Sequence, residues 1–333
     1  MEKLLFSFGL KVLACPICGK PLRPIFKKDV LTSLQCTHCH YYFSVKKGII
    51  KLLPPRKVQK KDYRKHLAII AKTYDKYSDI HDIAYHNPKM EYMRKVELKA
   101  LRFSKIKGTV LDMGCGTGKY TELLAKEGCN VIAMDVSRKM LEITKKKIVS
   151  KGLQSKVLYV HSDADTFPFL DNSLDAIIGI FGVLNHVLKY KSIFKSISRA
   201  LKPNGLLVFS VLNTYRLQWF IYEIFKKRRV KTIIKMIRNR DGYLKFPVKG
   251  RKRRVFCHNY NGIEIQKQLK DAGLEIQKMG GIYLLTYPQF KKEETLELKG
   301  IDKFFAKLED KIRWFPPFNM LGYYVIVIAR KKQ

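Results

Sequence analysis

The sequence lacks any uninterrupted apolar run of the ~18–20 residues that a membrane-spanning helix requires. Hydrophobic residues nevertheless make up 46% of its 333 residues, which indicates a globular protein with a large buried core. The apolar start of the chain is not followed by a small-residue cleavage site, so we expect no secretory signal peptide and a cytoplasmic protein.

Acidic residues are scarce: 28 Asp and Glu stand against 66 Lys and Arg, which gives a formal net charge of +38. Such an excess of positive charge attracts the phosphate groups of nucleic acid or of a lipid surface. The general lysine enrichment of thermophile proteins gives a similar charge without such a partner. Residues 216–260 hold 15 basic and 2 acidic residues, whereas residues 105–215 hold 16 and 9. A uniform bias would not concentrate the charge in one segment.

The number of cysteines, seven, is odd, which argues against a disulfide framework. Four of the cysteines form two Cys-x-x-Cys pairs, Cys15 with Cys18 and Cys36 with Cys39, on either side of residues 19–35. This spacing predicts a site in which four thiolates hold Zn²⁺ at about 2.3 Å, with no open position, so the metal is expected to be structural. The alternative, a redox Cys-x-x-Cys, normally occurs singly beside a βαβ unit.

Composition and periodicity divide the chain into three parts. We expect a zinc ribbon over residues 1–55 and a linker with helices over residues 56–104. Short apolar runs alternate with amphipathic stretches from residue 105 onward, which predicts an α/β domain over residues 105–333 with a mostly parallel sheet covered on both faces. Strands are expected at residues 110–113, 130–134, 157–160, 174–180, 206–210, 283–285 and 323–328.

A glycine-rich turn follows the first of these strands. Asp112 ends the strand, and Gly114, Gly116 and Gly118 follow in a Gly-x-Gly-x-Gly spacing. This pattern differs from the Gly-x-Gly-x-x-Gly of dinucleotide-binding proteins, and no Gly-Lys-Ser/Thr of a Walker loop is present. Glycines let the backbone approach a ligand closely, and the carboxylate of Asp112 provides an anionic environment for an ammonium group.

Two further carboxylates follow the next two predicted strands. Asp135 ends the second strand, one strand and one helix after Asp112, where a carboxylate can accept hydrogen bonds from both hydroxyls of a ribose. Asp163 follows the third strand and is placed to accept a hydrogen bond from an adenine amino group.

These motifs resemble those of class I S-adenosylmethionine-dependent methyltransferases over about residues 105–212. The matching segments occur in family order: VLDMGCGTG, MDVS, SDADTFPF, SLDAIIGIFGVLNH and RALKPNGLLVFSVLN. The resemblance implies a doubly wound, Rossmann-like α/β fold with seven strands, the last one antiparallel. It also implies that Val136 and Ala164 bind the cofactor beside the aspartates, and that Phe181, Gly182 and Leu184 surround the reacting methyl group.

The segment over about residues 10–54, LACPICGKPL…LQCTHCHYYFSVKKGIIKLLP, resembles the zinc-ribbon activator subunit of tRNA, rRNA and release-factor methyltransferases. It is also similar to the ribbon that opens bacterial ribosomal-RNA guanine methyltransferases. The match is partial, because Lys46 and Lys47 replace the usual acidic residue before the Gly-Ile step. The resemblance implies a ribbon and an enzyme within one chain.

The absence of two motifs narrows the range of possible methyl acceptors. No Asn/Asp-Pro-Pro-Tyr/Phe follows the fourth strand, which disfavours an exocyclic base amine, and no Pro-Cys nucleophile is present, which disfavours carbon 5 of pyrimidines. Asn185 and His186 follow that strand and are the predicted polar contacts to the acceptor. A capping or packing role for His186 is equally compatible with the sequence.

The basic segment, residues 213–260, leaves the acceptor class open. It follows the fifth strand as a lid-like insertion, and its apolar residues recur at helical spacing over residues 217–225 beside two clusters of four basic residues. RNA is the first hypothesis, with cations on phosphates and aromatics stacked on a splayed base. A lipid, quinone-like or other small acceptor at an anionic membrane surface is the second. Two further alternatives remain. The segment can be an amphipathic helix packed on the sheet with solvated charges, or the whole chain can be a ribbon-containing binding protein without catalytic activity.

Overall fold

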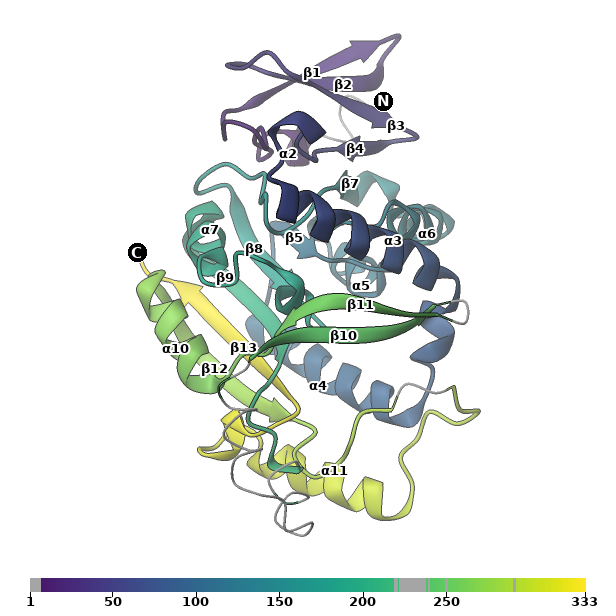
Figure 1. Cartoon of the computed structure of the whole chain (residues 1–333), viewed down its shortest axis with the longest axis vertical. Coiled ribbons are helices and arrows are strands. Elements are labelled where there is room, and N and C mark those ends of the chain that lie inside the picture. Colours follow the sequence, from purple (N-terminus) through teal and green to yellow (C-terminus); the bar gives the residue numbers. More distant parts are fainter. Residues whose placement is uncertain (1–6, 219–220, 222–237, 239, 249–250, 290–291) are drawn as a thin grey trace.

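The computed structural model describes residues 7–218, 221, 238, 240–248, 251–289 and 292–333. Its centre is an 11-stranded sheet of order β1-β2-β3-β4-β7-β6-β5-β8-β9-β13-β12 (Figure 1). The seven strands from β7 to β12 form the predicted doubly wound sheet. They are β5 (Thr109–Met113), β6 (Asn130–Asp135), β7 (Val157–His161), β8 (Leu174–Gly179), β9 (Leu201–Leu212), β12 (Leu274–Ile282) and β13 (Tyr324–Lys331).

Strands β5 to β9 run parallel, and the last strand, β13, is antiparallel to both of its neighbours, β9 and β12. The predicted fold class is thus confirmed. Strand β12 ends at Ile282, so the prediction of a strand over residues 283–285 is wrong. Tyr283 takes a positive φ of 57°, which breaks the extended conformation after that strand.

Helices cover both faces of the sheet because successive strand residues point to opposite sides. Val110, Val131 and Ile178 pack with residues of α4 (Pro88–Ser104), α5 (Lys119–Lys126) and α6 (Arg138–Ser150). Leu111, Ile132 and Ile177 pack on the other side with α7 (Ile193–Ala200), α10 (Gly262–Asp271) and the ribbon. The short elements are α2 (Ser7–Leu10), η1 (Arg56–Val58), η2 (Gln154–Lys156), η3 (Val183–His186) and η4 (Phe318–Met320).

The N-terminal ribbon comprises β1 (Leu22–Lys27), β2 (Val30–Cys36), β3 (Tyr42–Lys46) and β4 (Ile49–Lys51). Strand β4 pairs in parallel with β7, with Ile50 opposite Val160. The ribbon therefore extends the sheet of the α/β domain, and its packing places Leu34 and Phe43 in the same core as Leu158.

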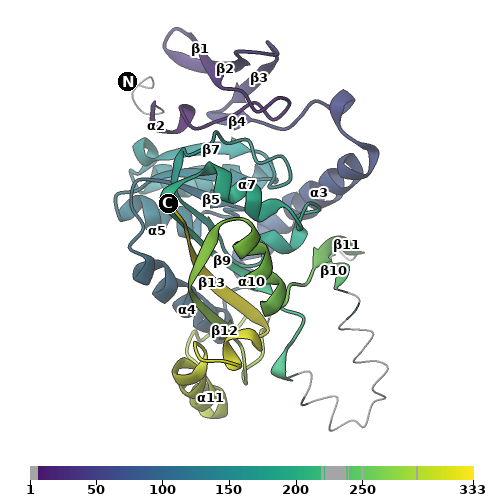
Figure 2. The same ribbon diagram turned by 90° about the vertical axis from the view of Figure 1, so that its left-hand side faces the viewer.

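Helix α3 (Lys61–Ala84) runs from the ribbon across the carboxyl ends of the parallel strands (Figure 1). A two-stranded hairpin of β10 (Asp241–Val248) and β11 (Arg251–His258) lies beside α3, outside the main sheet (Figure 2). Helix α11 (Gly300–Ile312) lies at the end of the molecule opposite the ribbon. Among the described residues, no helix has the length and apolar character needed to cross a bilayer.

Candidate functional site

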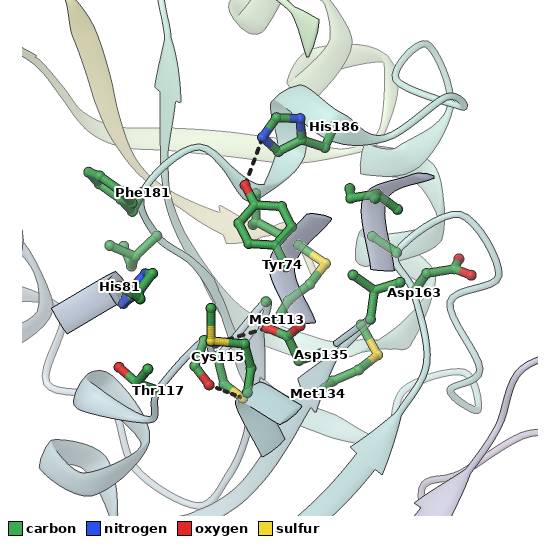
Figure 3. Close-up of a pocket in the computed structure, with 18 of the residues that line it drawn as sticks. Tyr74, His81, Met113, Cys115, Thr117, Met134, Asp135, Asp163, Phe181 and His186 are labelled. Atoms are coloured by element: carbon green, nitrogen blue, oxygen red, sulfur yellow. Dashed lines mark hydrogen bonds between the residues drawn. The ribbon is translucent and has the colours of Figure 1, made fainter. Parts of the chain in front are cut away.

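A cavity lies where the parallel strands end, between the glycine-rich loop and helix α3 (Figure 3). It brings together most of the residues that the sequence predicts for the site. The predicted residues that line it are Gly114, Gly116, Asp135, Val136, Asp163, Ala164, Phe181 and His186. Asp112, Gly118 and Asn185 do not line it, and neither do Gly182 and Leu184.

The glycine-rich loop has a backbone that only glycine adopts easily. Gly114, Gly116 and Gly118 have φ angles of 69°, 55° and 79°. A Cβ on Gly114 would collide with Val183, and one on Gly118 would lie 2.5 Å from Thr144. Gly118 thus serves the site indirectly, because it lets α5 begin close to α6.

Asp135 lies at the end of β6 with its carboxylate at the cavity wall. Its two oxygens accept hydrogen bonds from the amides of Gly116, at 2.9 Å, and Ser137, at 2.7 Å. Burial raises the pKa of Asp135 to about 6, although both amides favour the ionised form. This carboxylate is held in place by backbone groups and can accept further hydrogen bonds from a ligand.

Asp163 follows β7 at another wall of the cavity. One of its oxygens accepts a hydrogen bond from the Thr166 amide at 2.8 Å, and the other accepts one from the Tyr63 hydroxyl of α3. Burial raises the pKa of the Asp163 carboxyl. Helix α3 is therefore tied to the predicted adenine side of the cavity.

Asp112, which the sequence predicts to bind the cofactor, lies in β5 but does not line the cavity. It is buried behind the loop and accepts a hydrogen bond of 2.5 Å from the Thr121 hydroxyl of α5. Burial raises its pKa to about 7. In this structure the carboxylate of Asp112 fixes the start of α5.

Asn185 also has a role other than the predicted contact with the acceptor. Its side chain is fully buried, and its amide group donates to the carbonyls of Leu212, at 3.2 Å, and His258, at 2.6 Å. Its oxygen accepts from the Leu212 amide at 2.9 Å. All of its polar atoms are used to join η3 to β9 and to the hairpin, so none faces the cavity.

His186 lines the cavity and has a defined tautomer. Its Nδ1–H donates to the Phe256 carbonyl of the hairpin at 2.7 Å, so Nε2 is the acceptor for the Tyr74 hydroxyl at 3.1 Å (Figure 3). Burial lowers the pKa of His186 to about 4. His186 is therefore a neutral imidazole whose Nε2 lone pair is directed at the Tyr74 hydroxyl.

The part of the cavity around His186 is apolar and aromatic. Phe181 has a φ of 64°, an unusual conformation for a bulky residue, and its ring stacks on Tyr324 and meets Tyr85 edge-on. Phe246 of the hairpin packs against Tyr74, with ring centroids 5.4 Å apart. Leu67, Ile70, Ile180, Val183 and Val187 are further apolar residues that line the cavity.

Several lining residues come from the two helices before the α/β domain and were not predicted as site residues. Asp82 of α3 accepts a hydrogen bond from the Thr117 hydroxyl of the glycine-rich loop at 2.7 Å. Glu97 of α4 lines the same end, accepts from the Ser210 hydroxyl at 2.9 Å, and has a pKa that burial raises to about 7. No motif marks these residues, because their distance in sequence from the loop gives no local pattern.

The four ribbon cysteines converge as predicted. The Sγ atoms of Cys15 and Cys39 are 3.6 Å apart, those of Cys18 and Cys36 are 3.4 Å apart, and all four lie within 4.8 Å of one another. Zn–S bonds of about 2.3 Å in a tetrahedron place sulfurs at about these separations. The Cys36 sulfur also accepts from the amides of His38 and Cys39, at 3.4 Å each, as in a metal knuckle.

The basic segment forms a hairpin where the structure describes it. The predicted helix over residues 217–225 and the cluster at 226–229 lie largely outside the described residues. On the hairpin, Arg254 is exposed and its guanidinium lies 4.6 Å from the Tyr243 ring, which is itself 58% exposed. The opposite face, with Phe246 and Val255, packs towards the cavity and the core.

Comparison with known proteins bears on the α/β domain. Residues 111–209 match the protein family described as methyltransferase domain. The chain is 29% identical over 280 residues to the uncharacterized protein MJ1252 of Methanocaldococcus jannaschii, which covers 84% of this chain and 97% of that protein.

The chain is also 33% identical over 161 residues to the demethylmenaquinone methyltransferase of Lactobacillus johnsonii, and this covers 47% of the chain and 63% of that enzyme. Among solved structures, the [4+2]-cyclase SpnF is similar with a TM-score of 0.52 and 19% identity, over 79% of this chain and 96% of that one. This likeness shows the fold alone, since the named activity of that protein is a cyclisation.

Proposed function

We propose that this chain, which carries a methyltransferase domain of the S-adenosylmethionine-dependent class, methylates a planar apolar ring bound between α3, the glycine-rich loop and η3. The observation that carries the proposal is the composition of the cavity around His186. Aliphatic and aromatic side chains line much of it, and the cationic residues among the described lining residues, Arg94 and Lys119, come from α4 and α5 and not from α3 or η3. A ring without charge is the ligand that such a surface stabilises.

The residues present fit S-adenosylmethionine. The loop turns so tightly at Gly114 that a Cβ there would collide with Val183, and Asp135 presents a fixed carboxylate for the ribose hydroxyls. Asp163 and Ala164 would hold the adenine, and Glu97, Asp82 and Arg94 surround the end that receives the charged amino-acid part. The cofactor supplies an electrophilic methyl group on a sulfonium.

The protein's own contribution to transfer is positioning and removal of a proton. Phe181 and Val183 hold the acceptor ring against the loop, which brings the reacting atoms near ~3–3.5 Å and excludes water. The bound cofactor would release its methyl group from the sulfonium sulfur as the acceptor atom bonds to that carbon. The acceptor's proton passes to the Tyr74 oxygen as Tyr74 passes its own proton to Nε2 of His186.

One of the relatives named above supports this choice of acceptor. The demethylmenaquinone methyltransferase acts, by its name, on a quinone, and the chain spans 63% of its length. A reduced naphthoquinone is therefore the test acceptor. We expect label from methyl-labelled S-adenosylmethionine to enter 1,4-dihydroxynaphthalene with wild-type protein. Asp135→Ala should abolish the transfer. Equal transfer by Asp135→Ala and by the wild type would contradict the proposed site.

An RNA acceptor is a second candidate, which the outer face of the hairpin favours. Lys245 and Arg254 are exposed there, with Tyr243 beside them, an arrangement that can bind phosphates and stack on a base. Under this alternative, label would enter RNA, and binding would weaken steeply with salt because each phosphate contact releases a counterion. Lys245→Gln with Arg254→Gln would then reduce RNA methylation without changing S-adenosylmethionine affinity.

The cysteine cluster supports a structural zinc ion. Four thiolates at tetrahedral separations fit Zn²⁺, and no fifth ligand or open position is suggested by their arrangement. Zinc would fold the ribbon, because so few strands bury too little apolar surface by themselves. Since β4 pairs with β7, the metal would also stabilise the edge of the sheet that carries Asp163.

A further inference from the structure

Helix α11 exposes a continuous apolar stripe on the surface of the molecule. Ile301, Phe304 and Phe315 are 68%, 63% and 64% exposed, and Leu308 is 38% exposed. Ile301, Phe304 and Leu308 recur at intervals of three and four positions, so they lie on one side of the helix, and Phe315 follows shortly after its end. Phe305 and Ile312, which are half-buried, border the stripe towards the protein.

The other side of α11 is packed on the protein and explains why this stripe faces outward. Ala306, Glu309 and Arg313 are buried. Glu309 accepts hydrogen bonds from the Tyr92 hydroxyl at 2.7 Å and from the Thr286 amide at 2.7 Å. These buried polar contacts fix the rotation of the helix, so the apolar residues cannot turn inward without breaking them.

A row of lysines runs along one flank of the stripe. Lys303, Lys307 and Lys311 are spaced four residues apart and all are exposed. Among the described residues, none of the three forms an ion pair, because the acids of α11 are used elsewhere. Asp302 pairs with Lys89 at 3.2 Å, and Asp310 pairs with Lys99 at 3.0 Å.

We infer that α11 docks the protein on an anionic membrane surface. In that orientation the apolar stripe enters the boundary between headgroups and acyl chains, and the lysine row lies at the level of the anionic headgroups. The formal charge of +38 draws the whole molecule to the same surface. This inference rests on α11 and on the charge, and does not depend on which acceptor the cavity binds.

A second copy of the chain and an RNA fit the surface less well. Two α11 helices packed by their stripes would bring two rows of uncompensated lysines together, between molecules that each carry a large positive charge. RNA would meet the lysines but would leave Ile301, Phe304 and Phe315 in contact with a polar backbone. An anionic bilayer satisfies both the apolar stripe and its charged flank.

Vesicle co-sedimentation of the full chain tests the inference directly. We expect wild-type protein to bind mixed vesicles of phosphatidylcholine and phosphatidylglycerol and not to bind vesicles of phosphatidylcholine alone. Ile301→Ser with Phe304→Ser should reduce partitioning at least about 10-fold, because the stripe no longer inserts. Lys303→Gln, Lys307→Gln and Lys311→Gln together should reduce partitioning by about 100-fold at low salt, since each basic residue near such a surface contributes about five-fold.

Matched variants elsewhere control for general effects. Ile263→Ser removes an isoleucine that is 67% exposed on α10, and Lys139→Gln, Lys146→Gln and Lys151→Gln remove three exposed charges on and beside α6. Both should bind vesicles like the wild type.

Equal losses in control and α11 variants would overturn the inference, as would no binding to anionic vesicles. A dimer that Ile301→Ser with Phe304→Ser dissociates would also overturn it. Transfer to a water-soluble acceptor should be unchanged in the α11 variants, which separates this inference from the proposed function.

Discussion

The charge state of Asp135 sets the expected pH dependence of cofactor affinity. Burial raises its pKa to about 6, so the free protein binds a proton there below that pH. Only the ionised form accepts both ribose hydroxyls, and affinity should therefore fall as pH falls, by about 10-fold between pH 7.5 and pH 5.

Calorimetric titration with S-adenosylmethionine across this range measures the effect. Asp135→Asn should lower the affinity at pH 7.5 by about 10- to 100-fold and reduce the pH dependence, because the titrating group is gone. Asp112, whose pKa burial raises to about 7, contributes any dependence that persists in this variant. A wild-type affinity that is constant from pH 5 to pH 7.5 would contradict the assigned role of Asp135.

Tyr74 and His186 should act as one unit in the transfer step. Tyr74→Phe keeps the ring but removes the hydroxyl that bonds Nε2, so we expect kcat to fall about 10- to 100-fold with the dissociation constant of S-adenosylmethionine unchanged. His186→Gln should have a similar effect, and the double variant should be little worse than either one.

Tyr77→Phe is the matched control, because Tyr77 lies one helical turn from Tyr74 and does not line the cavity. It should retain nearly full kcat. Additive losses in Tyr74→Phe with His186→Gln would show that the two residues act separately, against the proposed relay. Since burial lowers the pKa of His186 to about 4, kcat should show no titration of this residue between pH 5 and pH 8.

Asn185 illustrates what a residue's place in the sequence does not reveal. Its position after β8 predicts a contact with the acceptor, but its burial depends on β9 and on a hairpin that follows much later in the chain. We expect Asn185→Ala to lower the free energy of unfolding by about 1–3 kcal/mol, because it leaves buried backbone groups without partners.

Urea unfolding measures this loss, with Gln154→Ala, at an exposed position, as the control. The folded Asn185→Ala protein should retain its affinity for S-adenosylmethionine. Unchanged stability together with a large loss of kcat would restore the original assignment of Asn185 to the acceptor site.

At the scale of elements, the ribbon and the α/β domain depend on one another. The spacing of the cysteines predicts the cluster because all four ligands lie within two local motifs. The pairing of β4 with β7 could not be predicted, since Ile49 and Ile50 form a short apolar run that fits several strand partners. The hydroxyl of Ser162 adds a 2.8 Å hydrogen bond to the Leu52 carbonyl, beside Asp163.

Loss of the metal should therefore also weaken cofactor binding. We expect Cys36→Ser to purify without zinc, to have a lower Tm and to bind S-adenosylmethionine more weakly, because β4 and Leu52 no longer support the end of β7. His38→Ala, at a neighbour outside the cysteine set, should retain about one zinc ion per chain. Wild-type protein without zinc after expression in zinc-replete medium would contradict the structural role.

The position of helix α3 over the strand ends could not be predicted from the sequence. The helical period of residues 61–84 is visible in the sequence, and Tyr74 belongs to its apolar side. That this side covers the strand ends follows only from tertiary contacts, such as Asp82 with Thr117 and Tyr63 with Asp163. The βαβ core, by contrast, was predictable because each strand and turn carries its own local pattern.

At the scale of the whole molecule, charge and cavity favour different acceptors. The concentration of basic residues over 216–260 predicts a phosphate-rich partner, and RNA remains a prediction on that basis. The cavity itself is apolar around His186, and α11 carries an exposed apolar stripe that charge counting does not reveal. An apolar acceptor at an anionic surface accounts for the charge, the stripe and the cavity together.

The most direct measurement is the fate of a labelled methyl group. Wild-type protein and Asp135→Ala are incubated with methyl-labelled S-adenosylmethionine and a cell extract, which is then divided into an organic-soluble fraction and an RNA fraction. We expect label in the organic-soluble fraction with the wild type and none with Asp135→Ala. Label in the RNA fraction alone, or no transfer to either fraction, would contradict this expectation.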